Sequence, residues 1–137
     1  SDLAKIDAAG LTDRILFLGK QPFSELPKLF KAMTIVTALS RNEGFGLTVL
    51  EAMASGAAVL ASEAGAWKDI VRAGIDGHIV PCDDLTSTQE KLGLMMSNPA
   101  QLVEMGLQGR ERVEQHYSIE REARDLTQFL SSLTIIE

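Results

Sequence analysis

Two glutamates flanking a glycine pair are the residues of this sequence best suited to chemistry. Glu43 directly precedes the segment Gly44-Phe45-Gly46, and Glu51 follows it with seven residues between the two carboxylates. Glycines allow the backbone to turn sharply and to approach a ligand closely. A helix beginning near Gly46 presents free amides and a partial positive charge, which together favour a phosphate. Carboxylates accept hydrogen bonds from hydroxyl groups. The segment therefore predicts a site for phosphates flanked by hydroxyls, the layout of a nucleoside diphosphate sugar.

Each part of this segment also has a simpler interpretation. Two glycines before a helix can form a plain turn, and Glu51 can face solvent on a half-exposed helix. However, Glu51 stands between Leu50 and Ala52 in an otherwise apolar run. A charge at such a position is costly unless a partner satisfies it. This cost favours the ligand-binding interpretation.

Alternating short strands and helices must position this segment. Apolar runs typical of buried strands occupy residues 15–18, 35–39, 58–61 and 78–80. Helical spacing of apolar residues occurs between them, at 26–33 and 49–54. The alternation predicts βα units and a Rossmann-like parallel sheet of about four strands buried on both faces. Ligands bind at the carboxyl ends of strands in such sheets, which is where residues 40–46 follow a strand.

The remainder of the chain predicts only helices. We expect a single domain, 1–137, with the sheet in about 1–82 and a helical tail in about 83–137. Asp84 is predicted to cap the first tail helix, and Asn98 followed by Pro99 to cap the second. The second helix is expected to bury apolar side chains and to be weakened by two glycines. These residues are Leu102, Val103, Met105 and Leu107, with Gly106 and Gly109. A break at Tyr117-Ser118 precedes a third helix, whose apolar residues are Ala123, Leu126, Phe129 and Leu130.

Composition excludes several classes of function. The net charge of −6 and the absence of a clustered basic surface argue against nucleic acid as a partner. A single cysteine, Cys82, excludes an internal disulfide and fits a cytoplasmic location. No apolar run approaches the roughly 18 residues of a membrane span, and the first residues do not form a signal peptide. Neither a carboxylate pair nor a histidine cluster indicates a metal.

The chain opens in a predicted helix, whereas a doubly wound domain opens on a strand followed by a phosphate-binding turn. We therefore expect a partial domain whose first βα unit lies elsewhere. An open sheet edge would then allow copies of the chain to associate as a homo-oligomer.

Residues 43–56 resemble the E-x7-E motif of retaining GT-B glycosyltransferases, in particular family 4, or group 1. Four other segments resemble that family in the same order along the chain: residues 14–19 with 25–27, 35–40, 57–65 and 74–81. The resemblance covers nearly the whole chain. It implies a truncated GT-B C-terminal domain, which binds the nucleotide sugar.

The resemblance also implies residue roles. Glu43 is expected to be the catalytic residue and to contact hydroxyls of the transferred sugar, and Glu51 to bind the ribose. The sugar and phosphate pocket is expected to contain the amides of Gly44, Phe45, Gly46 and Leu47, with Thr48 near the distal phosphate. The residues expected near the nucleobase are Gly19, Lys20, Gln21 and Leu26. No metal or other cofactor is implied, since the donor is an NDP-sugar whose leaving diphosphate is stabilised electrostatically.

The family's diphosphate-binding Arg and Lys, and its acceptor-binding N-terminal domain, precede the residues present here. We therefore expect this chain alone to be inactive. The parent protein is expected to transfer a hexose to a glycan or lipid-linked acceptor in cell-surface polysaccharide synthesis. It would be cytoplasmic and peripheral at the inner face of the membrane. Two alternatives remain open: a nucleotide-sugar epimerase domain and a non-catalytic oligomerising fragment.

Three further residues have less specific interpretations. His78 and Cys82 are each interpreted as structural, since neither has a neighbouring partner for chemistry in the sequence. Trp67 is predicted either to pack its helix onto the sheet or to face the donor pocket.

Overall fold

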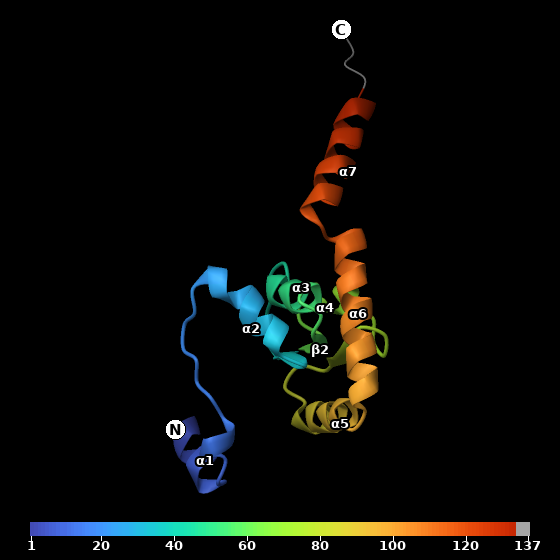
Figure 1. The fold of residues 1–137 in the computed structure, drawn as a ribbon. Coiled ribbons are helices and arrows are strands. Elements are labelled where there is room, and N and C mark those ends of the chain that lie inside the picture. Colours follow the sequence, from blue (N-terminus) through green and yellow to red (C-terminus); the bar gives the residue numbers. More distant parts are fainter. Residues whose placement is uncertain (134–137) are drawn as a thin grey trace.

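A computed structural model describes residues 1–133 (Figure 1). In chain order, its elements are α1 (Asp2–Ala8), η1 (Thr12–Arg14), η2 (Phe23–Glu25), α2 (Leu26–Ala32), β1 (Ile35–Ala38), α3 (Leu47–Ala54), β2 (Ala58–Ser62), α4 (Trp67–Ile70), β3 (Gly77–Val80), α5 (Leu85–Met96), α6 (Pro99–His116) and α7 (Ile119–Ser132).

A parallel three-stranded sheet in the order β1-β2-β3 forms the centre of the fold. Every residue of β2 is buried, because strands flank it on both sides and helices cover both faces. One face packs through Val36, Ala38, Val59 and Ala61 against α3 and α4. The other face packs through Leu60 and Val80 against Met95 of α5 and Leu102 and Met105 of α6. Helices on both faces of a parallel sheet confirm the predicted α/β class.

The prediction of about four strands is wrong in one segment. Residues 15–18 form no strand, and all four side chains are exposed, with Leu16 at 80%. Ile15 has extended dihedral angles (φ −123°, ψ 125°), as its β-branched side chain favours. Extended dihedrals make a strand only when a neighbouring strand completes the hydrogen-bonded ladder, and β1 is the edge of the sheet in the described residues.

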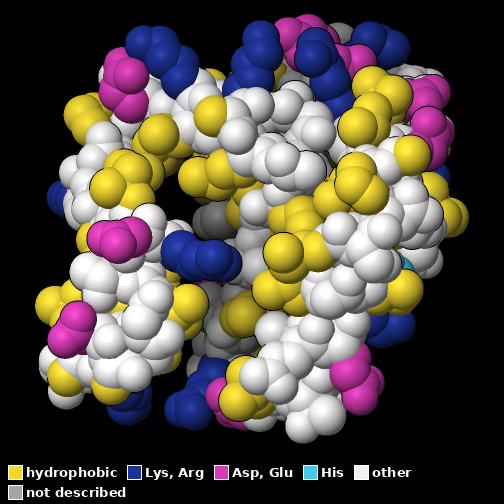
Figure 2. All heavy atoms as spheres, turned by 60° about the horizontal axis from the view of Figure 1, so that its bottom comes forward, with side chains coloured by type: hydrophobic (Ala, Val, Ile, Leu, Met, Phe, Trp, Pro, Cys, Tyr) yellow, Lys and Arg dark blue, Asp and Glu magenta, His cyan; other side chains and the backbone are white. Residues whose placement is uncertain are grey.

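The N-terminal segment lies apart from the sheet. Figure 1 shows α1 at the end of a long extended connection that leads to α2. Figure 2 shows a hollow between this segment and the body of the molecule, with hydrophobic side chains on both sides of it. The apolar side chains of residues 15–18 consequently have no core to pack into.

The glycines of α6 have a packing role that the sequence did not predict. Gly106 and Gly109 are buried, and a Cβ on Gly106 would lie only 2.0 Å from the carbonyl oxygen of Gly56. Gly106 lets α6 pack backbone to backbone against the turn between α3 and β2, and Gly109 lies against the side chains of Met53 and Asp76. Val103 and Leu107 were expected to be buried, but they are 64% and 59% exposed because they lie on the opposite side of α6.

The predicted helix boundaries in the tail are confirmed. Asp84 Oδ1 accepts from Ser87 N at 2.9 Å, and Asn98 Oδ1 accepts from Gln101 N at 3.2 Å. Ser118 caps α7 by accepting from Arg121 N. Helix α7 has a strongly amphipathic pattern, yet none of its residues is buried, and Figure 1 shows it projecting away from the sheet. Among residues 1–133, no helix combines the length and apolar character needed to cross a bilayer.

We predict that Gly106→Ala lowers the free energy of unfolding by about 3 kcal/mol, because its Cβ would overlap a backbone carbonyl that cannot rotate away. Gly93→Ala on α5 is the matched control, since a Cβ there meets nothing within 4 Å. The free energy of unfolding of the control should rise by about 0.5–1 kcal/mol, because alanine has a higher helix propensity than glycine. Urea denaturation monitored by circular dichroism measures both. Equal effects of the two substitutions would contradict the assigned contact.

Candidate functional site

The candidate site is the loop from Leu39 to Gly46, which connects the carboxyl end of β1 to α3. Gly46 is the N-cap of α3 and has left-handed dihedrals (φ 81°, ψ 27°), which an L-residue adopts with difficulty. No side chain caps this helix. The amides of Leu47 and Thr48, in the first turn of an α-helix, therefore lack the usual intrahelical partners and side-chain acceptors. Such a terminus can bind an anion.

The beginning of the loop is tied to the ends of both other strands. The carbonyl oxygen of Ser40 accepts from Ser62 Oγ at 2.5 Å, at the end of β2. It also accepts from Cys82 Sγ at 3.7 Å, just beyond β3. Arg41 forms an ion pair with Asp83 at 2.9 Å. Because all three strands are parallel, their carboxyl ends meet at one edge of the sheet, and the loop is held there.

Glu43 is oriented within this loop from both sides. Ser40 Oγ donates to Glu43 Oε1 at 3.0 Å, and the side chain of Glu43 is partly buried. The Glu43 carbonyl runs directly past Gly65, where a Cβ would lie 2.4 Å from the carbonyl oxygen. Gly65 therefore allows the turn after β2 to support the loop at its middle.

The last glycine of the loop rests on α4. A Cβ on Gly46 would lie 2.6 Å from Trp67 Cδ1, 2.8 Å from Trp67 Nε1 and 3.1 Å from Ile70 Cδ1. Trp67 is 1% exposed, and its Nε1 has no hydrogen-bond partner among the described residues. Of the two positions that the sequence left open for Trp67, the structure confirms packing in the core, with the ring directly beneath the loop.

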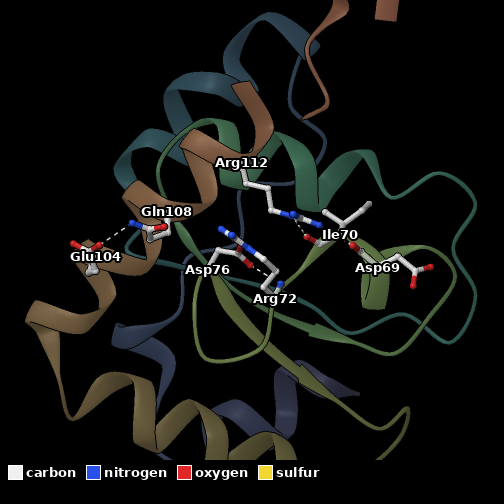
Figure 3. A network of polar contacts seen from close by, with 7 residues as sticks. All are labelled: Asp69, Ile70, Arg72, Asp76, Glu104, Gln108 and Arg112. Carbon is white, nitrogen blue, oxygen red and sulfur yellow. Dashed lines mark hydrogen bonds and ion pairs between the residues drawn. The ribbon is translucent and has the colours of Figure 1, made fainter. Parts of the chain in front are cut away.

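Helix α4 is held in turn by α6. Arg112 Nε donates to the Ile70 carbonyl at 2.7 Å and its Nη2 to the Asp69 carbonyl at 3.1 Å, as Figure 3 shows. In the adjoining turn, Arg72 pairs with the fully buried Asp76 at 2.6 Å. These contacts satisfy the carboxyl end of α4 and fix its position under the loop.

Glu51 lies in an apolar groove of about 300 Å³ between α2 and α3. The lining consists of Phe23, Leu26, Pro27, Phe30, Glu51, Ala54 and Ser55. No hydrogen bond or ion pair within residues 1–133 engages the Glu51 carboxylate, which is partly exposed toward the groove. An apolar groove with one unpaired acceptor suits a flat ring joined to a group that carries hydroxyls.

The predicted site residues divide among several places. Leu26 and Glu51, far apart in sequence, share the groove. Gly19 and Lys20 lie in the exposed segment before it, Gln21 is partly buried there, and none of the three lines the groove.

The loop residues themselves face other surroundings. Gly44 and Thr48 are exposed, and so are Phe45 at 72% and Leu47 at 60%. Phe45 lines a second hollow of about 420 Å³ with Tyr117 and Arg121 at the junction of α6 and α7.

Sequence reasoning missed two features of the site. Phe23 and Phe30 contribute the aromatic walls of the groove. The proline at position 27 could have indicated that α2 begins there, because proline is common in the first turn of a helix. Phe23 just before the helix and Phe30 within it then line the same groove. No local signal indicated that Arg112, 42 residues after Ile70, supports the loop through α4.

Two titratable groups near the strand ends have shifted pKa values. Hydrogen bonds from Ser87 lower the pKa of Asp84. Burial, and secondarily the charge of Lys91, lowers the pKa of His78. A lowered pKa favours the neutral form of His78.

Comparison with known proteins gives consistent results. The family model described as "Glycosyl transferases group 1" matches residues 3–112. The chain is 40% identical over 130 residues to the lipopolysaccharide core biosynthesis mannosyltransferase LpcC of Rhizobium leguminosarum bv. viciae, covering 95% of the chain and 36% of that protein. It therefore spans about a third of the length of this curated relative.

Solved structures agree. The C-terminal domain of a glycosyl transferase group 1 family protein (LpcC) from Francisella tularensis superimposes with a TM-score of 0.79 and 35% identity, covering 85% of this chain and 60% of that one. Anabaena HepE in complex with UDP superimposes with a TM-score of 0.86 over 96% of this chain and 36% of that one. At 24% identity, this second likeness concerns the fold alone.

We predict that Gly65→Ala displaces the loop at Glu43 and lowers the free energy of unfolding by about 3 kcal/mol, through backbone overlap added to left-handed strain. Gly74→Ala is the matched control: φ is +80° there, but a Cβ has nothing within 4 Å. The free energy of unfolding of the control should fall by only about 1 kcal/mol, because the left-handed strain acts there without any overlap. Urea titrations of both variants measure the difference, and a loss at Gly74 as large as that at Gly65 would refute the contact.

Proposed function

This chain belongs to the group 1 glycosyltransferases, and from that premise we propose that it binds the nucleotide-sugar donor of a retaining hexosyltransferase. The observation that carries the proposal is the position of the uncapped amino end of α3. It lies in the loop after β1, with Glu43 before it and Glu51 one turn into the helix. Amides between two carboxylates are complementary to a diphosphate between two groups that carry hydroxyls.

The amides of residues 44–47 would donate hydrogen bonds to the phosphate oxygens, with Thr48 near the distal phosphate. Transfer of the sugar leaves additional negative charge on the diphosphate. The amide dipoles would stabilise that developing charge, and the contacts of the loop with Ser62 and Gly65 would limit how far the loop reorganises. Glu43, oriented by Ser40, would accept from hydroxyls of the transferred sugar and act as the catalytic residue. No step in this scheme requires a metal.

The groove between α2 and α3 would hold the nucleoside. Its aromatic and aliphatic lining is suited to the flat face of a nucleobase, and the Glu51 carboxylate at its edge is suited to the two ribose hydroxyls. Gly19, Lys20 and Gln21 are proposed to approach the base from the segment that leads into α2. The UDP bound by the HepE structure is a ligand of this class.

The parent protein is proposed to transfer a hexose, mannose by analogy with LpcC, to a glycan or lipid-linked acceptor. The acceptor would be bound by residues outside this chain, and 137 residues alone would not complete the reaction. Synthesis of lipopolysaccharide core would place the parent in the cytoplasm at the inner face of the membrane. The family match favours transfer over the epimerase alternative.

We predict that Glu51→Ala weakens nucleotide binding by about 10- to 100-fold, the loss expected for hydrogen bonds to a charged acceptor. Saturation-transfer NMR and calorimetry with UDP, GDP and ADP measure the affinity and identify the base. Glu90→Ala on the exposed surface of α5 is the control and should leave affinity unchanged. Equal affinity of the Glu51 variant and the wild type would overturn the assigned ribose contact. If the chain bound none of the three nucleotides, the proposed function of this chain would be overturned.

A further inference from the structure

We propose that Trp67 is a positioning residue for the phosphate-binding amides, and that its indole N–H donates to a loop carbonyl in the nucleotide-bound form. The proposal rests on the proposed function, because the ligand that selects this form is the diphosphate. It assigns a specific partner to a buried donor that has none in the unliganded chain.

The edge of the indole that carries Nε1 faces the loop. The two indole atoms nearest to a Cβ built on Gly46 are Cδ1 at 2.6 Å and Nε1 at 2.8 Å. Any side chain at position 46 would therefore collide with the ring. Glycine at this position brings the loop backbone within reach of the indole donor.

The indole N–H is an exception within the described residues. Trp67 Nε1 is the one buried side-chain nitrogen or oxygen there without a hydrogen-bond partner. Buried donors are nearly always paired, because burial removes water and an unpaired donor loses that interaction uncompensated. An unpaired donor that touches a binding loop indicates that a second arrangement of the loop satisfies it.

The ring is fixed, whereas the loop can rotate its peptide groups. Trp67 begins α4, which Arg112 holds through the carbonyls of Asp69 and Ile70 (Figure 3). Above it, Gly44 and Phe45 are exposed, and Gly44 has open space around its Cβ position. Glycine accepts either sign of φ, so the peptide groups beside Gly44 and Gly46 can turn at low cost.

Peptide geometry couples the two events. In a trans peptide group, the N–H and the C=O point in opposite directions. When a phosphate draws a loop N–H outward, the carbonyl of the same peptide group turns inward, toward the indole. We assign the carbonyls of Gly44 and Phe45 as the acceptors, because their peptide groups carry the N–H of Phe45 and of Gly46. The hydrogen bond to Trp67 then holds the amides in their phosphate-binding orientation.

Phenylalanine at position 67 separates this role from packing. Trp67→Phe keeps an aromatic ring but removes the N–H. In the unliganded chain, the change removes an unpaired donor, so the melting temperature should fall little or not at all relative to Trp67→Leu, which loses the ring as well. Affinity for UDP or GDP should nevertheless fall about tenfold in Trp67→Phe, the loss of about one hydrogen bond.

Nitrogen-15 NMR of the 137-residue chain provides a direct test, since Trp67 is its single tryptophan and gives one indole signal. Titration with UDP and with GDP should move that indole proton downfield in step with the amides of residues 44–48. Loop amides that shift while the indole signal stays unchanged would overturn the role of Trp67 and leave the proposed function intact. So would a Trp67→Phe chain with wild-type affinity. If neither the loop amides nor the indole signal moved with either nucleotide, both proposals would be overturned.

Discussion

The close contact between Gly106 of α6 and the carbonyl of Gly56 is the constraint on which the rest of the structure depends. Only glycine permits this approach, and it brings α6 against the turn between α3 and β2. With α6 at that distance, Leu102 and Met105 reach one face of the sheet. The later part of the same helix places Arg112 next to α4. A longer separation of the two backbones would remove both contacts, since a side chain reaches its partner only over a few ångströms.

A series of contacts extends from α6 through α4 to the loop. Arg112 holds α4, Trp67 of α4 lies beneath Gly46, and Gly46 begins α3 with its amides free. The opposite end of the loop depends on the sheet, through the carbonyl of Ser40 and the side chains at the ends of β2 and β3. A loop fixed at both ends restricts the movement of its amides to rotations of the peptide groups between those ends. Electrostatic stabilisation of a leaving diphosphate requires this kind of preorganisation.

The core and the outer segments of the chain differ in how their apolar residues are used. The buried apolar residues of the described chain all lie between Val36 and Met105, in two clusters on the faces of the sheet. In contrast, residues 15–18 and the apolar side of α7 are exposed, although both are patterned like buried elements. The spacing of apolar residues shows that an element has an apolar face. It does not show whether another element of the chain covers that face. This is why the predicted first strand is wrong, while the three strands with neighbours and the caps at Asp84 and Asn98 are correct.

The sequence by itself determined the α/β class, three of the four predicted strands, the helix caps, and the segment that carries Glu43 in the loop and Glu51 in α3. These follow from local rules: residue spacing, capping side chains and glycines that precede a helix. Only the tertiary structure decided that Leu26 and Phe23 share a groove with Glu51, that Gly106 is a packing contact, and that Arg112 and Trp67 support the loop. Such contacts join residues from different parts of the chain. Their geometry is set by how helices pack on the sheet, and no single segment of sequence contains that information.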